Sequence, residues 1–288
     1  MSEAPSGPAP VLAGSSIIDV RMWFDESPWR VAAGWTVLAA GLAAGLNVDA
    51  FVAQASTFVL LFVLADPLWG SIWGLMSAPD SLPSLRRSLE RSRVWLPYLR
   101  SGSPAARLFG MDGPGILVVI YRVALPVIFL ALVVSLILHP AALWLTLLLI
   151  GISTAGWLHH QVESIPIGIL YALVTVALPW LLVVLVLGGE TNQTPPLLLA
   201  GLWTLHFWAT ETHSAGGGNQ LTLAVIAATH VGLALLLIFL QLPLWLVFLS
   251  IFLLPTWLAV YQGQSIQRVR FWWLAAMLTS GLALGQII

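Results

Sequence analysis

The sequence predicts an all-α polytopic membrane protein with nine transmembrane helices. Hydrophobic residues make up 59% of its 288 residues and charged residues only 8%, whereas soluble domains carry about 25% charged residues. A bilayer core about 30 Å thick needs about 20 apolar residues per helix, and runs near that length recur along the chain. The arginines lie before or at the start of the first run, or in and beside alternate connections between the runs, as expected for a chain that crosses a membrane repeatedly.

Nine apolar runs, bounded by polar residues, glycine or proline, fit a spanning helix. They are residues 29–46, 50–76, 116–138, 141–158, 165–187, 196–210, 221–240, 242–261 and 271–288. The sixth run is short enough to end early or to tilt. Pro126, Pro179 and Pro255 lie inside runs, and such kinks are tolerated in lipid when neighbouring groups pair with the freed carbonyls.

Two segments lie outside this single transmembrane domain of residues 29–288. Residues 1–28 lack the basic and then apolar order of a signal peptide, so they are predicted to be a tail with a short interfacial segment. The longest connection, residues 77–115, contains leucines interleaved with arginines at helical spacing between residues 83 and 99. Such a basic amphipathic helix is typical of the lipid headgroup layer.

The 11 basic residues are all arginines. Two flank the first run, six lie in the second connection, Arg122 begins the third run, and Arg268 and Arg270 precede the ninth. With nine spans they all fall on one face of the membrane. Because arginine and lysine are enriched in cytoplasmic loops, we expect a cytoplasmic N-terminus and a C-terminus outside.

A first motif lies at residues 64–84, LADPLWGSIWGLMSAPDSLPS, where the second run enters the long connection. It resembles the first signature of the UbiA-type intramembrane prenyltransferases, and within them the chlorophyll and bacteriochlorophyll synthase branch. In that branch an Asn-Asp-x-x-Asp-x-x-x-Asp cluster ends the second membrane helix. Asp66 matches the first aspartate, Ala65 stands at the asparagine, and Trp69 and Trp73 stand at the other two aspartates. The motif is therefore degenerate.

A second motif lies at residues 206–222, HFWATETHSAGGGNQLT, at the end of the sixth run. It resembles the second signature of the same family, roughly Asp-x-x-x-x-Glu-Gly-Asp-x-x-x-Gly. Glu211 matches the acidic residue, His213 falls where an aspartate is expected, and Gly217 matches the glycine turn. The resemblance implies a UbiA-like bundle, with two half-sites over one cavity and the 77–115 loop as a cytoplasmic cap. It also suggests a bacterial cytoplasmic membrane.

The missing aspartates affect the chemistry that the family performs. Its members ionise an allylic diphosphate held by magnesium between the two aspartate clusters, and Mg²⁺ requires oxygen ligands. Here the two motifs offer Asp66, Glu211 and Asp80, while the indoles of Trp69 and Trp73 supply no oxygen. Residues three and four positions apart are neighbours on a helix, so Asp66 and the two tryptophans are expected on one face. That face favours a stacked or apolar ligand.

Two histidines lie inside the apolar runs, namely His206 and His230. Polar side chains within the membrane generally face the bundle interior and find a partner there, so structural hydrogen bonding is the favoured interpretation. Axial ligation of a tetrapyrrole magnesium by a neutral imidazole is the alternative. The predicted ligand-binding residues are Asp66, Trp69, Trp73, Arg122, His206 and Glu211.

Three functions remain open. The favoured one is a non-catalytic accessory subunit of a membrane complex, photosynthetic by resemblance, that binds membrane lipid and an isoprenoid, a quinone or a (bacterio)chlorophyll. The second is an active prenyltransferase that uses Mg²⁺ with Asp66, Glu211 and His213 to attach an isoprenoid to an aromatic or tetrapyrrole acceptor. The third is a structural or transport protein. Transport predicts a pair of broken, charged helices, which the sequence does not reveal. No motif for binding nucleotides or nucleic acids is recognisable.

Overall fold

The computed structural model describes residues 32–77, 125–162, 167–188, 194–214, 220–262 and 264–287. Apart from Leu125 and Pro126, these residues belong to one compact unit, which comprises Met22–Ala78 and Val127–Ile288. All regular secondary structure in the described residues is helical, which confirms the all-α prediction for them. The predicted tail, nearly all of the 77–115 loop, and Arg122 lie outside the described residues.

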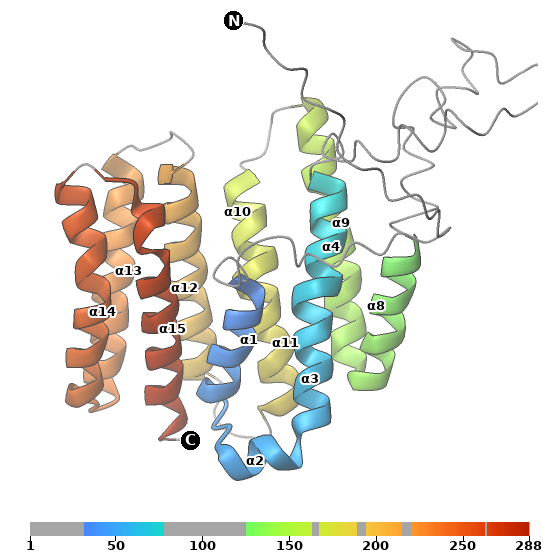
Figure 1. Cartoon of the computed structure of the whole chain (residues 1–288), viewed down its shortest axis with the longest axis horizontal. Helices are drawn as coiled ribbons and strands as arrows, with labels where there is room; N and C mark the ends of the chain where they lie inside the picture. Colours follow the sequence, from blue (N-terminus) through green and yellow to red (C-terminus); the bar gives the residue numbers. More distant parts are fainter. Residues whose placement is uncertain are drawn as a thin grey trace, which may run out of the picture. The chain divides into compact units, whose positions relative to one another are not determined.

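Apart from the short helix α2, which lies across one end, the labelled helices run nearly parallel or antiparallel to one another (Figure 1). In chain order they are α1 (Ala32–Ala43), α2 (Val48–Ala53), α3 (Ala55–Val63), η2 (Leu64–Leu68), α4 (Trp69–Ser77), α8 (Leu125–Leu138), α9 (Pro140–Val162), α10 (Ile167–Ala172), η6 (Leu173–Ala177), α11 (Leu178–Leu187), α12 (Thr194–Thr212), α13 (Gln220–Phe239), α14 (Pro243–Tyr261), η8 (Ile266–Val269) and α15 (Arg270–Gly285). The elements η2 and η6 are π-helical turns and η8 is a 3₁₀ turn.

Each predicted run contains a described helical segment, but its bounds often differ. The second run begins with the separate short helix α2, because the Asn47 side chain accepts a hydrogen bond from the Ala50 amide at 2.8 Å and starts a helix there. The sixth run does not end early, since α12 has 19 residues. Among the described residues, four segments are long and apolar enough to cross a membrane: Ala55–Gly74, Gly168–Leu187, Gln220–Phe239 and Pro243–Tyr261. These four support a membrane protein, and the total of nine crossings stays a prediction.

The tightest helix pair joins elements far apart in the sequence. Helices α1 and α15 lie side by side (Figure 1), and Gly281 and Gly285 of α15 face the α1 backbone. A Cβ atom added at Gly281 would lie 2.3 Å from the Ala39 carbonyl oxygen, and one at Gly285 would lie 1.9 Å from the Leu42 oxygen. Small residues four apart allow such close contact between membrane helices. This pair places the first turn of α1 in the middle of the bundle.

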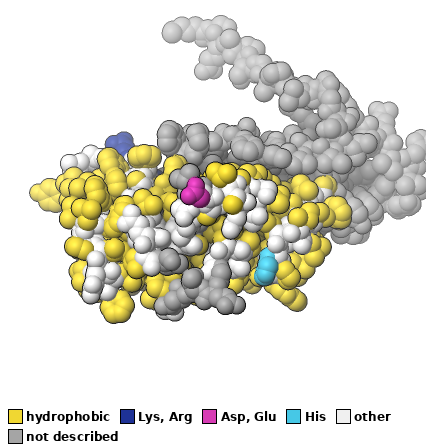
Figure 2. Space-filling model, turned by 90° about the horizontal axis from the view of Figure 1, so that it is seen from below, with side chains coloured by type: hydrophobic (Ala, Val, Ile, Leu, Met, Phe, Trp, Pro, Cys, Tyr) yellow, Lys and Arg dark blue, Asp and Glu magenta, His cyan; other side chains and the backbone are white. Residues whose placement is uncertain are grey.

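Helices α13 and α14 carry the most exposed apolar surface among the four candidate spans. Only 28% of the apolar stretch of α13 and 22% of that of α14 is buried, against 50% in each of the other two spans. Phe239 and Tyr261, at the ends of these helices, are 83% and 90% exposed. Figure 2 shows the described residues, seen from below, as mostly hydrophobic with isolated charged groups. Such a surface is compatible with contact to lipid.

Candidate functional site

Two of the candidate spans are interrupted by a π turn. The first, η2, contains Asp66 and Pro67, and the second, η6, is followed directly by Leu178 and Pro179. Proline removes a backbone donor and opens the helical ladder, and π turns are frequent at functional sites. The two composite helices run in opposite directions (Figure 1), and both turns contact α1. The sequence analysis did not reveal these broken helices, because proline alone does not distinguish a kink from a π turn.

Asp66 connects the first π turn to α1. The backbone amide of Gly34 donates a hydrogen bond to its half-buried carboxylate. Gly34 lies in the first turn of α1, where backbone amides have no acceptor within the helix, and a carboxylate at this end is favoured by the helix dipole. Asp66 therefore satisfies the start of α1, and the carboxylate that the first motif retains already has a structural role.

The two tryptophans at aspartate positions pack inside the bundle. Trp69 is fully buried, and its Nε1 donates to Thr146 Oγ1 of α9 at 3.1 Å. That hydroxyl lies 2.6 Å from Ser135 Oγ of α8. The Trp73 ring packs so closely on α9 that a Cβ atom at Gly156 would lie 3.2 Å from it. In the described structure both indoles fill the space between α4 and its neighbours.

An aromatic bridge, consisting of Trp73, Tyr171 and Phe207, links the two motifs. The ring centroids of Trp73 and Tyr171 are 6.2 Å apart, and those of Tyr171 and Phe207 are 5.9 Å apart. The guanidinium of Arg270 lies 5.3 Å from the Phe207 centroid, and its Nη2 lies 3.1 Å from Glu211 Oε1. The structure thus connects the first and second motifs through aromatic rings and Arg270.

Glu211 is engaged in the ion pair with Arg270. The side chains of the two residues are 19% and 18% exposed, so the pair is largely shielded from water. From the sequence alone Arg270 contributes only to the predicted topology, and Tyr171 and Phe207 are not predicted as site residues. A basic residue at the start of the ninth run could have been matched with the acid at the end of the sixth, whereas no sequence signal pointed to the two aromatic residues.

His213 and Glu211 have different partners. Its Nδ1 lies 3.0 Å from Thr222 Oγ1, which connects the end of α12 to the beginning of α13. Arg122, which is also a predicted ligand-binding residue, lies outside the described residues. Trp73 and Glu211 are therefore connected through the aromatic bridge and Arg270, whereas His213 contacts the adjacent helix α13.

His206 and His230 form the centre of a histidine cage, which also contains Trp203, Trp257 and Trp273. The two imidazoles stack with centroids 5.1 Å apart, while Trp203 and Trp273 lie nearly perpendicular to His206. Trp257 Nε1 lies 3.0 Å from His230 Nδ1. Because an indole N–H can only donate, Nδ1 is the acceptor and Nε2 of the neutral ring carries the hydrogen. His230 therefore offers no lone pair to a tetrapyrrole magnesium in this arrangement. Neither ring nitrogen of His206 has a hydrogen-bond partner among the described residues, so the prediction of structural hydrogen bonding is wrong for His206.

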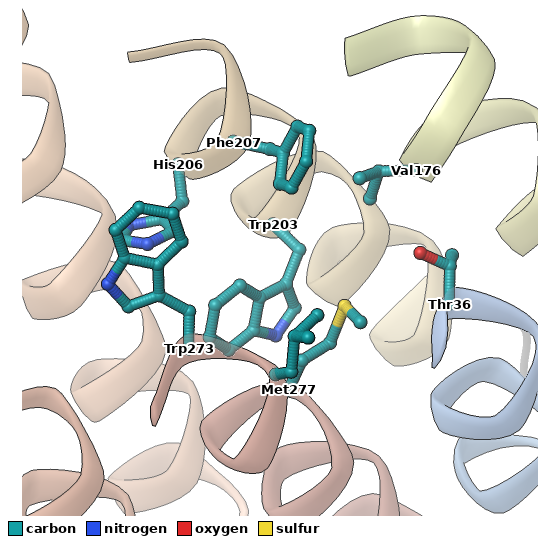
Figure 3. A pocket seen from close by; sticks show the side chains of 8 residues that line it. Thr36, Val176, Trp203, His206, Phe207, Trp273 and Met277 are labelled. Atoms are coloured by element: carbon teal, nitrogen blue, oxygen red, sulfur yellow. The ribbon is translucent and has the colours of Figure 1, made fainter. Parts of the chain in front are cut away.

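Next to the histidine cage lies a small apolar cavity (Figure 3). Its lining residues come from α1, η6, α12 and α15, and are Thr36, Val176, Trp203, His206, Phe207, Trp273, Leu274 and Met277. It has about 10 Å³ of space for the centre of a water molecule, which is room for about one water. An isoprenoid chain or a tetrapyrrole needs more space than this cavity provides in the described conformation.

The described residues do not fit a site for two magnesium ions. Among them, no three His, Asp or Glu side chains lie close enough to share a metal ion. Asp66 and Glu211 are engaged with Gly34 and Arg270, and Asp80 lies outside the described residues. No family model, curated protein or solved structure matches the chain. The proposed function therefore rests on the motif resemblance together with the geometry of these residues.

A double substitution tests the ion pair at this site. Arg270→Met is expected to lower the free energy of unfolding by about 1–3 kcal/mol, because it leaves the largely shielded carboxylate of Glu211 without its ion-pair partner. Adding Glu211→Gln should recover part of this loss, since the uncompensated charge is then removed. Thermal unfolding in detergent micelles measures both variants. If Arg270→Met and the double variant with Glu211→Gln have equal melting temperatures, Arg270 does not compensate the charge of Glu211.

Proposed function

We propose that the protein is a non-catalytic relative of the UbiA-type prenyltransferases that serves as an accessory subunit in a membrane complex. In this proposal it crosses the membrane nine times, with its N-terminus in the cytoplasm and its C-terminus outside. Its ligand is an apolar lipid of the isoprenoid, quinone or (bacterio)chlorophyll class. The observation that carries the proposal is the use of the motif residues for internal packing and pairing.

The contacts at three motif positions support the loss of catalysis. Trp69 donates to Thr146 and Trp73 stacks on Tyr171, so neither position offers an oxygen to a cation. Glu211 would have to leave Arg270 before it could bind a metal. Mg²⁺ prefers octahedral oxygen ligands that include one or two carboxylates. Binding a magnesium diphosphate here would require several internal contacts to break together.

The exposed surface supports a role among lipids and membrane partners. Apolar side chains dominate the outward faces of α13 and α14, and these faces give a large area for lipid or for another membrane helix. Within this role the aromatic bridge and the histidine cage stiffen the interior of the bundle. Partner subunits of a pigment-containing complex are part of the proposal by resemblance.

An active prenyltransferase is the second candidate. The observation that favours it is the meeting of both motifs at one end of the bundle, since Trp73 and Glu211 are connected through the aromatic bridge and Arg270. In that case Asp66, Glu211 and His213 would act with Mg²⁺, and Arg122 would bind the diphosphate.

A transfer assay separates the two candidates. The purified full-length protein in phospholipid nanodiscs is incubated with Mg²⁺, radiolabelled geranylgeranyl diphosphate and either chlorophyllide or an aromatic acid as acceptor. We expect no transfer product, and no difference between the wild type and Asp66→Ala. Native mass spectrometry and absorption spectroscopy of the same preparation should reveal a co-purified apolar lipid.

The matched control is Asp49→Ala, which removes an exposed acid from the short helix α2. A product that requires Mg²⁺, persists in Asp49→Ala and disappears in Asp66→Ala would establish the enzyme and overturn the non-catalytic proposal.

A further inference from the structure

The π turn η6 depends on another helix for one of its hydrogen bonds. Pro179 has no backbone N–H, so the carbonyl of Thr175, four residues earlier, loses its α-helical donor. The Oγ1 hydroxyl of Thr36 in α1 donates to this carbonyl at 3.0 Å. A rotatable hydroxyl on a separate element therefore replaces a bond that would otherwise lie within the helix backbone.

A second hydroxyl weakens the regularity of the same turn. Thr175 Oγ1 donates back to the Tyr171 carbonyl at 2.7 Å, and such back-bonding bends helices. The other π turn also has a back-bonded hydroxyl nearby, because Ser71 Oγ in α4 donates to the carbonyl of Pro67 within η2. Sharp bends in helices arise at proline and at π turns, and η6 combines a π turn with a nearby proline.

Unfilled space lies directly beside η6. Val176 of the turn and Thr36 of α1 line the apolar cavity from one side, and Trp203, Phe207 and Met277 line it from the other (Figure 3). The same threonine that holds the Thr175 carbonyl is therefore part of the cavity wall. Movement of η6 away from α1 would break one hydrogen bond and enlarge this cavity.

We propose that η6 is a hinge, that Thr36 holds it closed, and that its opening admits an apolar chain into the cavity between α1, α12 and α15. The lipid occupant rests on the proposed function, whereas the hinge rests on the geometry of Thr36, Thr175 and Pro179. An isoprenoid or acyl chain fits the chemistry of the lining, because the atoms that border the cavity are apolar. Release of the Thr36 hydroxyl is the step that couples bending to entry.

The absence of cysteine from the chain allows the hinge to be tested with paired spin labels. One pair joins Ile169, before the hinge in α10, to Leu282 in α15, and the control pair joins Leu185, after the hinge in α11, to the same Leu282. All three side chains are partly exposed, at 38%, 41% and 43% for Ile169, Leu282 and Leu185. Distances are measured by electron paramagnetic resonance on the full-length protein in phosphatidylcholine nanodiscs.

The hinge predicts a broader distance distribution for the Ile169–Leu282 pair than for the control pair. Thr36→Val should broaden or lengthen the first distribution further, Thr36→Ser should leave it as in the wild type, and Pro179→Ala should narrow it. The control pair should not change in any variant. Equal widths for both pairs, unaffected by Thr36→Val and Pro179→Ala, would overturn the hinge.

A photoreactive probe tests the occupant separately. Farnesol carrying a diazirine is added to the same nanodiscs, and its crosslinks are located by mass spectrometry of the digested protein. We expect crosslinks near Trp203 and Met277 that increase in Thr36→Val and decrease in Pro179→Ala. Hinge motion without these crosslinks would contradict lipid entry and leave the hinge standing. Crosslinks that are unchanged in all variants would support a lipid site but contradict its gating by η6.

Discussion

Gly281→Ala is expected to destabilise the protein by about 1–3 kcal/mol, the usual cost of forcing an extra carbon into a packed interior, and Gly281→Leu by more. The added Cβ atom would lie 2.3 Å from the carbonyl oxygen of Ala39. A backbone atom cannot rotate away as a side chain can, so α1 and α15 would have to separate. Because these two helices also bound the apolar cavity, the effect should extend to the centre of the bundle. Unfolding in detergent micelles, followed by circular dichroism, measures the loss.

Gly201→Ala and Gly151→Ala are matched controls for this prediction. Both glycines lie within helices, in α12 and α9, and an added Cβ would meet nothing within 4 Å. Alanine is favoured over glycine in a helix by about 1 kcal/mol, so these variants should be neutral or slightly more stable than the wild type. If Gly281→Ala unfolds like these controls, the close contact between α1 and α15 is wrong.

Thr36→Val is expected to lower the free energy of unfolding by about 1–3 kcal/mol, the usual cost of a buried polar group without a partner. Valine has nearly the shape of threonine but no hydroxyl, so the Thr175 carbonyl loses its donor. The side chain of Thr36 is fully buried, and the adjoining cavity is bordered by apolar atoms, so a water in it would lack the two or more polar partners that hold a buried water. Thermal unfolding of the purified protein measures the change.

A double-mutant cycle shows whether this loss arises from Pro179. Pro179→Ala restores a backbone N–H at position 179, which can donate to the Thr175 carbonyl. In that background Thr36→Val should cost clearly less than it does alone, and the difference is the coupling between the two sites. Fully additive effects would contradict the role of Thr36 as the substitute donor. Pro255→Ala in α14 is the control, since it changes an internal proline at a different helix and should show no coupling to Thr36.

Some of this organisation could be predicted from local sequence. The positions of α9, α12, α13, α14 and α15 follow closely from the apolar runs, because a helix that faces lipid must be apolar over most of its length. Asp66 and Glu211 could be selected because they stand at acidic positions of the two motifs that the sequence resembles. The expectation that a freed carbonyl near a proline finds a partner on another helix is confirmed for Pro179 by Thr36.

The partners of these groups depend on contacts that local sequence does not encode. Local sequence places Trp69 and Trp73 at positions where the motif that it resembles has aspartates, but only the packed bundle shows Trp69 donating to Thr146 and Trp73 facing Tyr171. The sequence predicts that Asp66 and the two indoles form one face that is open to a ligand. In the described structure both indoles are instead buried in the packed bundle.

The amino-acid sequence by itself determined that the chain is helical and apolar enough to lie in lipid. It also determined the two motifs, at residues 64–84 and 206–222, from which the function is proposed. Only the tertiary structure decided that the carboxylate of Asp66 accepts a hydrogen bond from Gly34 in the first turn of α1, that Glu211 pairs with Arg270, and that π turns interrupt two candidate spans. The physical reason is that apolarity and helical period act within one segment. Hydrogen bonds, ion pairs and ring contacts are decided by which side chains meet when separate helices pack.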